Sequence, residues 1–290
     1  MASVLADVRG YFSAEASEWD GPVEGRVLLG RGQLVLAASD DDTVTIPLQS
    51  VFDVTVGDKP TFFDPMPGTP VTVAYNDGVD RVAATVSGDE NTIEKFATLL
   101  FKALLNGTEA TIKHPARVGG RVVDSSYRAA LLGLDAGAVQ FDTDEGPVTV
   151  RLDSVVDFDR ETRTVDGDDR PVLVVSHMDD GTDLTTLAAT DSARTLSLLG
   201  RFLRQQYQAV LASLRDLSLS EPETETLATI YAAGDVDVSL ASVLGVEPKV
   251  VKRILHSLHE KGLIESGETG PTLTAKGQIV VNHYLERVNA

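Results

Sequence analysis

The chain of 290 residues contains no cysteine. This absence excludes a disulfide scaffold, a thiolate zinc site, an iron–sulfur centre and a cysteine nucleophile, and it fits a reducing compartment. Long apolar runs are also missing, since no window approaches the roughly 18 apolar residues that a membrane-spanning helix needs. Residues 1–12 carry Asp7 and Arg9 within their only apolar stretch, which argues against a secretion signal. We therefore expect a cytoplasmic protein. Membrane lipid is not an expected partner either, because the strand-rich part of the chain lacks a cluster of lysine and arginine that could meet lipid phosphates.

Basic residues are scarce, and lysine is the scarcer of the two. The sequence has 8 lysines and 17 arginines against 28 aspartates and 16 glutamates, which gives a formal net charge of −19. Each third of the chain is acidic, so the excess is not a local tail. The 42% of hydrophobic residues still supplies enough apolar surface for folded domains. A uniformly acidic coat is typical of proteins in molar salt, where charges are screened over about 3 Å, and we interpret the chain as halophilic.

The chain contains an internal repeat. Residues 44–54 (VTIPLQSVFDV) and 148–158 (VTVRLDSVVDF) share six of eleven positions at an offset of 104 residues. In each copy apolar and polar residues alternate as in short antiparallel strands, and helical spacing ends the copies at residues 93–104 and 196–211. An antiparallel sheet of this length closed by one C-terminal helix is the plan of a pleckstrin-homology-like (PH-like) split barrel. A small sandwich with a capping helix is the alternative that the pattern leaves open.

After Leu214 the alternation ends and helical spacing replaces it. One helix begins after Ser220, a short helix ends at Gly245, and a third runs through residues 248–261, followed by a short strand, a turn and a last helix. This order is typical of a winged helix-turn-helix. The sequence therefore predicts a multidomain α+β protein with two tandem PH-like repeats and a winged helix-turn-helix. The expected domains are residues 1–108, which include an N-terminal extension, residues 109–213 and residues 214–290.

The third helix of the C-terminal domain carries the candidate partner-binding residues. These are Lys249, Lys252, Arg253, His256 and Lys261. They give the segment a local positive charge. This charge either faces solvent or contacts a partner, and the partner is either DNA, through its phosphates, or a protein. Because the domain as a whole is acidic and Glu268 lies in the expected wing, we favour a protein partner and consider nucleic acid the less suited one.

Other motifs do not indicate catalysis or metal binding. Among the five histidines only His256 and His259 can share a helix face, whereas zinc requires three or four ligands. Residues 142–146 and 166–169 resemble fragments of calcium loops but lack the glutamate at position twelve, so we interpret them as acidic hairpin turns. The sequence contains neither a P-loop nor a Gly-x-Ser-x-Gly motif. We expect no catalytic residue, no metal and no cofactor, and hence a protein that is not an enzyme.

Three segments resemble one family. They are residues 3–12 (SVLADVRGYF), residues 44–51 (VTIPLQSV) and residues 243–255 (VLGVEPKVVKRIL). With these segments the chain resembles, over its full length, the archaeal taxis family CheF in its haloarchaeal form. The resemblance implies a non-enzymatic adaptor of archaeal chemotaxis and phototaxis. Such an adaptor links the Che proteins, notably the phosphorylated response regulator CheY, to the switch proteins of the archaellum motor. A winged-helix transcription regulator that binds DNA is the alternative.

Overall fold

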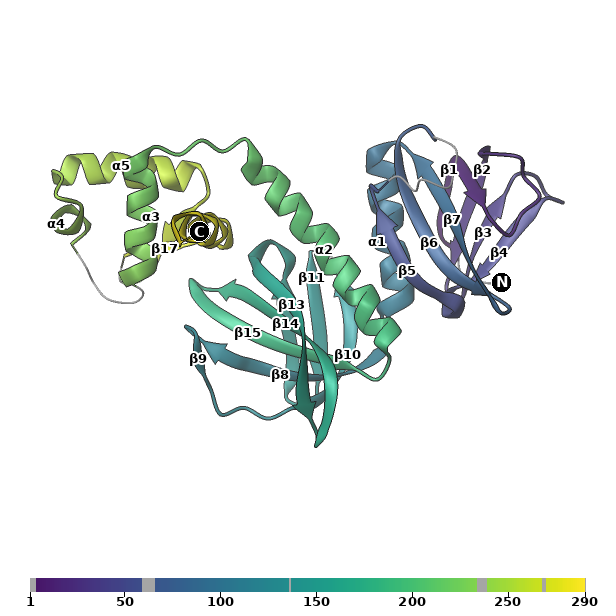
Figure 1. The fold of residues 1–290 in the computed structure, drawn as a ribbon, viewed down its shortest axis with the longest axis horizontal. Coiled ribbons are helices and arrows are strands. Elements are labelled where there is room, and N and C mark those ends of the chain that lie inside the picture. The colour runs from purple at the N-terminus through teal and green to yellow at the C-terminus, as the bar shows by residue number, and fades with distance from the viewer. Residues whose placement is uncertain (1–3, 59–65, 136, 234–238, 268–269, 290) are drawn as a thin grey trace.

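The computed structural model describes residues 4–58, 66–135, 137–233, 239–267 and 270–289. Within these ranges the chain forms two large antiparallel sheets, a two-stranded sheet and six α-helices. The expected α+β class is therefore confirmed. Figure 1 shows the two large sheets as separate layers, with one long helix running from their junction toward the C-terminal helices.

The first sheet has seven strands in the order β4-β3-β2-β1-β7-β6-β5. The strands are β1 (Val4–Ala14), β2 (Val23–Gly30), β3 (Gln33–Ala37), β4 (Thr43–Pro47), β5 (Val51–Val56), β6 (Thr69–Asp77) and β7 (Asp80–Gly88), and helix α1 (Glu90–Leu105) follows them. Strand β1 lies at the centre of the sheet, between β2 and β7. The N-terminal segment, expected as an extension of the first repeat, is thus part of its sheet.

The second sheet has eight strands, seven of them in the order β12-β11-β10-β8-β15-β14-β13, and a short β9 that pairs with β8. The strands are β8 (Thr108–Val118), β9 (Arg121–Val122), β10 (Arg128–Asp135), β11 (Ala138–Thr143), β12 (Gly146–Arg151), β13 (Val155–Val165), β14 (Asp168–Asp179) and β15 (Thr182–Thr190), and helix α2 (Ala193–Arg215) follows them. The acidic segments 142–146 and 166–169 lie at the β11–β12 and β13–β14 connections, as hairpin turns.

The two sheets have the same strand order once β9 is set aside, as the internal repeat predicts. A single turn of 3₁₀ helix precedes the fifth strand of each copy, at Leu48–Ser50 and Leu152–Ser154, and so keeps the offset of the repeat. Each copy also ends in a helix that a side chain caps: Asp89 accepts from the Thr92 amide, and Ser192 accepts from the Arg194 amide. The order of elements agrees with a PH-like plan, which stays a prediction.

The two copies share one continuous hydrophobic core rather than two separate ones. At their junction Phe101 of α1 contacts Phe202 of α2, with ring centroids 5.4 Å apart. Arg201 of α2 donates two hydrogen bonds of 2.8 Å to the carboxylate of Asp53 on β5. Arg194 reaches the carbonyl oxygen of Leu48 at 2.7 Å. Apolar packing and arginine contacts together fix one copy against the other.

The C-terminal unit has its own small core, formed by apolar side chains of three helices and the two-stranded sheet. Its elements are α3 (Glu221–Ala233), α4 (Leu240–Leu244), α5 (Pro248–Glu260), β16 (Ile264–Ser266), β17 (Pro271–Leu273) and α6 (Ala275–Asn289). A Cβ on Gly277 of α6 would lie 2.0 Å from the carbonyl oxygen of Leu263, so this close approach requires glycine. Residues 268–269 of the expected wing, including Glu268, lie outside the described residues, and so does Gly234, where the sequence predicts the end of the first C-terminal helix.

Candidate functional site

Helix α5 carries the candidate site, and its sequence determines which face is exposed. Pro248 occupies the first turn, where its missing amide hydrogen costs nothing. Val251 and Leu258 are buried, at 7% and 0% exposure, and Leu258 belongs to the core of the C-terminal unit. Apolar residues at this spacing turn one side of the helix inward, so the basic residues between them face outward.

Four of the five predicted residues lie on the outward face. Lys249, Lys252, Arg253 and His256 are all exposed, and their spacing of three, four and seven residues places them on one side of the helix. His256 lies 3.4 Å from the carboxylate of Glu260, one turn further along. Within the described residues Lys249, Lys252 and Arg253 form no ion pair of their own. We call these four side chains the basic face of α5.

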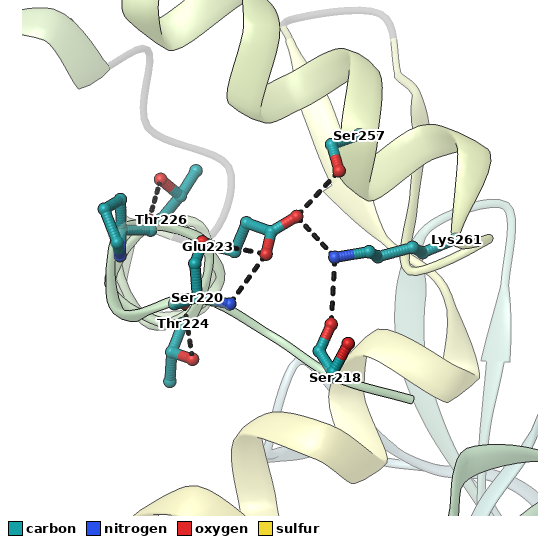
Figure 2. Close-up of polar contacts among 8 residues, drawn as sticks. Ser218, Ser220, Glu223, Thr224, Thr226, Ser257 and Lys261 are labelled. Carbon is teal, nitrogen blue, oxygen red and sulfur yellow. Dashed lines mark hydrogen bonds and ion pairs between the residues drawn. The ribbon is translucent and has the colours of Figure 1, made fainter. Parts of the chain in front are cut away.

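Lys261 has a different position from the other four. Its ammonium nitrogen is 2.6 Å from Oε1 of Glu223 and 3.0 Å from the carbonyl oxygen of Ser218. Figure 2 shows both contacts as dashed lines. The side chain of Glu223 is only 8% exposed. Lys261 therefore connects the end of α5 to the start of α3 and does not belong to the basic face.

Glu223 is the centre of this polar network. Its Oε2 accepts hydrogen bonds from the backbone amide and the hydroxyl of Ser220, at 2.7 and 2.8 Å, and its Oε1 accepts one from Ser257 at 2.7 Å. Burial acts to raise the pKa of Glu223, but the hydrogen bonds from Lys261, Ser220 and Ser257 outweigh it and lower the pKa to about 2. The carboxylate thus stays charged and holds α5 in a fixed orientation on α3.

Sequence analysis did not single out Glu223, although its signal is present. Ser220 and Glu223 have the Ser-x-x-Glu spacing of a capping box, in which the glutamate accepts from the amide of the N-cap residue. The pairing with Lys261 has no such signal, because it depends on how α3 and α5 pack.

The C-terminal unit also contacts the second copy directly. Ala275 and Ile279 of α6 form a buried apolar cluster with Val156 of β13, and Tyr207 and Leu211 of α2 pack against it. This apolar contact joins the C-terminal unit, which carries the basic face, to the shared core of the two sheets. Polar contacts within the C-terminal unit and apolar contacts beneath it thus position α5.

A second polar cluster, which sequence analysis did not identify, lies on the second sheet. The rings of His114 and His177 stack with centroids 5.8 Å apart, and both hydrogen-bond to the hydroxyl of Thr186, at 2.8 and 3.0 Å. Together with Arg128 and Asp179 the rings line an open hollow of about 460 Å³. Burial, and to a lesser extent His114, lowers the pKa of His177 to about 4, so its imidazole is neutral at pH 7. The two histidines are far apart in the sequence, and no spacing pattern connects them.

The described residues contain no group of three or more histidine, cysteine, aspartate or glutamate side chains arranged to hold a metal ion. His259 is exposed on α5. Across the same parts of the chain, none of the helices combines the length and the apolar character that crossing a membrane requires.

The chain is a modular α+β protein with two equivalent antiparallel sheets and a helical C-terminal unit. Its candidate site is a surface, formed by an exposed basic helix. Comparison with known families gives this class a specific identity. The family model described as "Archaeal Chemotaxis signal transduction system protein F" (CheF-arch) matches residues 4–209, which span every described strand of both large sheets and most of α2. The chain belongs to this CheF family and has a role in archaeal chemotaxis.

Two relatives from Halobacterium salinarum match most of this chain. Taxis protein CheF2 is 38% identical over 291 residues, which cover 99% of this chain and 99% of the relative. Taxis protein CheF1 is 30% identical over 255 residues, which cover 87% of this chain and 84% of the relative. The halophilic source of both relatives agrees with the acidic, lysine-poor composition. A solved C-terminal domain of an unknown protein from Leishmania infantum aligns over 36% of this chain and 85% of its own length, with 14% identity and a TM-score of 0.25.

Proposed function

We propose that the protein is a non-enzymatic cytoplasmic adaptor that links the phosphorylated response regulator CheY, and other Che proteins, to the switch proteins of the archaellum motor. The observation that carries the proposal is the basic face of α5, formed by Lys249, Lys252, Arg253 and His256. These side chains are exposed in a chain with a net charge of −19, where most of the surface repels an acidic partner. Membership of a chemotaxis family supplies the biological setting.

We further propose a division into three domains that correspond to the three units described above. Residues 1–108 and 109–213 would be PH-like repeats, and residues 214–290 would be a winged helix-turn-helix. The shared strand order supports the first assignment, and the order of three helices, a two-stranded sheet and a last helix supports the second. Such a protein offers several surfaces on modules that hold them at fixed distances, which is what an adaptor requires.

A DNA-binding regulator is the second candidate, because α5 occupies the place of a recognition helix in that order of elements. Salt distinguishes the two functions. Binding through several phosphates weakens log-linearly and steeply with salt concentration, since it releases condensed counterions. A protein interface adapted to molar salt persists under those conditions because its ion pairs are in direct contact.

The test is a triple charge reversal, Lys249→Glu, Lys252→Glu and Arg253→Glu. At about 2 M KCl, where the screening length is only a few Å, binding to purified CheY with and without beryllofluoride, and to purified switch proteins, is measured by calorimetry. We expect at least one affinity to fall by about tenfold or more, which is about 1.4 kcal/mol. Loss of binding to a promoter fragment at low salt, with all protein affinities unchanged, would favour the regulator over the adaptor.

The matched control reverses three exposed charges on the two sheet units, Lys95→Glu, Arg121→Glu and Arg160→Glu. It changes net charge by the same amount as the test variant but leaves α5 intact. The control should bind every partner like the wild type. Equal losses in both triple variants would mean that overall charge, rather than the basic face, determines binding.

A further inference from the structure

Helix α2 differs from the rest of the chain in its charge. Its 23 residues contain four arginines and no aspartate or glutamate, although the whole chain has 44 acidic residues. Arg194 and Arg201 are engaged at the junction of the two sheets. Arg204 and Arg215 are exposed and form no ion pair within the described residues. Two cationic side chains on this helix are therefore free to meet a partner.

These two arginines line a groove between α2 and strand β5 of the first sheet. The groove has a volume of about 590 Å³. Arg201, Arg204, Gln208 and Arg215 line it from the helix, and residues 54–58 line it from the strand side. At 1.5 Å per residue, the helical wall from the first to the last of these arginines is about 20 Å long. Figure 1 shows β5 on the side of the first sheet that faces α2.

One of the side chains that line the groove has a polar atom without a partner. Oε1 of Gln205 is buried and accepts no hydrogen bond. A buried acceptor without a donor is costly, and rotation of this side chain toward the groove would let an N–H of a bound segment satisfy it. The groove thus combines cationic groups, which attract carboxylates, with an amide side chain whose oxygen is unpaired.

We propose that the α2–β5 groove binds an extended acidic segment of a protein partner. A segment of about six residues matches the length of the helical wall at roughly 3.3 Å per residue. The guanidinium groups of Arg204 and Arg215 present planar pairs of donors that match carboxylates. In molar salt only ion pairs in direct contact persist, and a groove excludes water around such pairs better than a flat surface does.

A carboxylate segment suits this groove better than nucleic acid does. Duplex DNA carries one charge per roughly 1.7 Å, so it would bring many phosphates against a chain of net charge −19, and against Asp58, which lines the groove. A short peptide brings only a few charges, each of which can pair with an arginine. The groove is on α2 and β5, apart from the basic face of α5, and its proposal does not rest on the adaptor function.

The experiment measures binding of a fluorescein-labelled Glu-Val-Glu-Val-Glu-Val-Glu-Val peptide to the full chain by fluorescence anisotropy, at about 2 M KCl, where only contact pairs survive. The probes for comparison are the same peptide with glutamine in place of glutamate and a 20-nucleotide single strand of DNA. The test variant is Arg204→Glu with Arg215→Glu, and the matched control is Arg121→Glu with Arg160→Glu, also two exposed arginines.

We expect saturable binding of the glutamate peptide to the wild type and to the control variant. The test variant should bind it about tenfold more weakly or worse, and the glutamine peptide should bind no variant. Circular dichroism verifies that each variant is folded. Absence of saturable binding, equal affinity of the test and control variants, or tighter binding of the oligonucleotide that depends on Arg204 and Arg215 would each overturn the proposal.

Discussion

The two sheet units have the same strand order but fill the same place with different side chains. In the first unit Tyr75 pairs with Val51, at the start of the fifth strand, and is 2% exposed. In the second unit His177 pairs with Val155 and has the same exposure of 2%. Burial raises the pKa of Tyr75 to about 12 and lowers that of His177 to about 4, so both side chains are neutral at pH 7. The two copies thus keep the same strand pairing at this position, but a tyrosine occupies it in the first copy and a histidine in the second.

Neighbouring residues differ together with this exchange. Ala14 of β1 pairs with Ala84 of β7 in the first unit, where the second unit has His114 and Thr186. In the first copy the two alanines leave room for one tyrosine. In the second copy the hydroxyl of Thr186 connects two imidazoles. The contacting residues of the two cores thus differ as a set, since exchanging His177 alone would remove its contacts with His114 and Thr186.

The largest expected effect tests the junction that the copies share. Replacing Phe101, which is 1% exposed and contacts Phe202, by alanine should lower the free energy of unfolding by about 3–5 kcal/mol. Because the core is continuous, both copies should lose stability in one transition. Denaturant unfolding in molar KCl, followed by circular dichroism and by the fluorescence of Trp19, the single tryptophan, measures this.

The exposed Leu131, at 49% exposure, provides the control, since Leu131→Ala removes little buried surface. If the Trp19 signal shifts in Phe101→Ala while the remaining ellipticity does not, the two copies unfold independently. The two copies would then be separate domains in contact rather than one cooperative unit.

The next effect concerns the C-terminal unit. With a folded pKa of about 2 against 4.5, Glu223 contributes about 3 kcal/mol of stability above pH 4.5, which is lost as the pH falls toward 2. Glu223→Gln should remove that contribution at pH 7 and flatten the acid dependence. Hydrogen exchange of α5 measures it, because the network holds this helix.

Glu225→Gln is the matched control, on the same helix two residues further and exposed. It should leave exchange in α5 unchanged. Faster exchange in the two sheets, rather than in α5, would contradict the assignment of Glu223 to the C-terminal unit alone.

Sequence reasoning predicted the elements better than it predicted their contacts. Alternation and helical spacing were sufficient for the repeat and its two terminal helices, and the 3.6-residue period placed the basic face of α5 outward. Lys261 shares the charge of that face but not its location, because its pairing with Glu223 depends on how two helices pack. Likewise, His114 and His177 meet through strand register. Such contacts follow from tertiary geometry, which local patterns do not encode.

A smaller effect distinguishes the two copies by pH. The folded pKa of His177 is about 4 against 6.5 unfolded, so the unfolded chain binds more protons and stability falls as the pH decreases from 6.5 toward 4. Burial also lowers the pKa of His114, which adds in the same direction. The loss between pH 7 and pH 5 attributable to His177 is about 2 kcal/mol. Denaturant midpoints across that range measure it.

The control gives the second copy the side chains of the first: His114→Ala, His177→Tyr and Thr186→Ala. This variant should keep its stability at pH 7 within about 1.5 kcal/mol, since the exchanged set already fits the same frame once. Its stability should no longer fall between pH 6.5 and pH 5. A persisting loss in this range would assign the acid sensitivity to other groups.

The smallest effect tests the ion pair across the junction. Arg201 and Asp53 form two hydrogen bonds of 2.8 Å, but their side chains are 39% and 28% exposed, so water competes for both. A double-mutant cycle of Arg201→Gln and Asp53→Asn should give a coupling energy of about 0.5–1 kcal/mol at low salt. Molar KCl should reduce it only partly, because the groups are in direct contact. A coupling as large as the effect of Phe101→Ala would mean that this ion pair, rather than apolar packing, holds the two copies together.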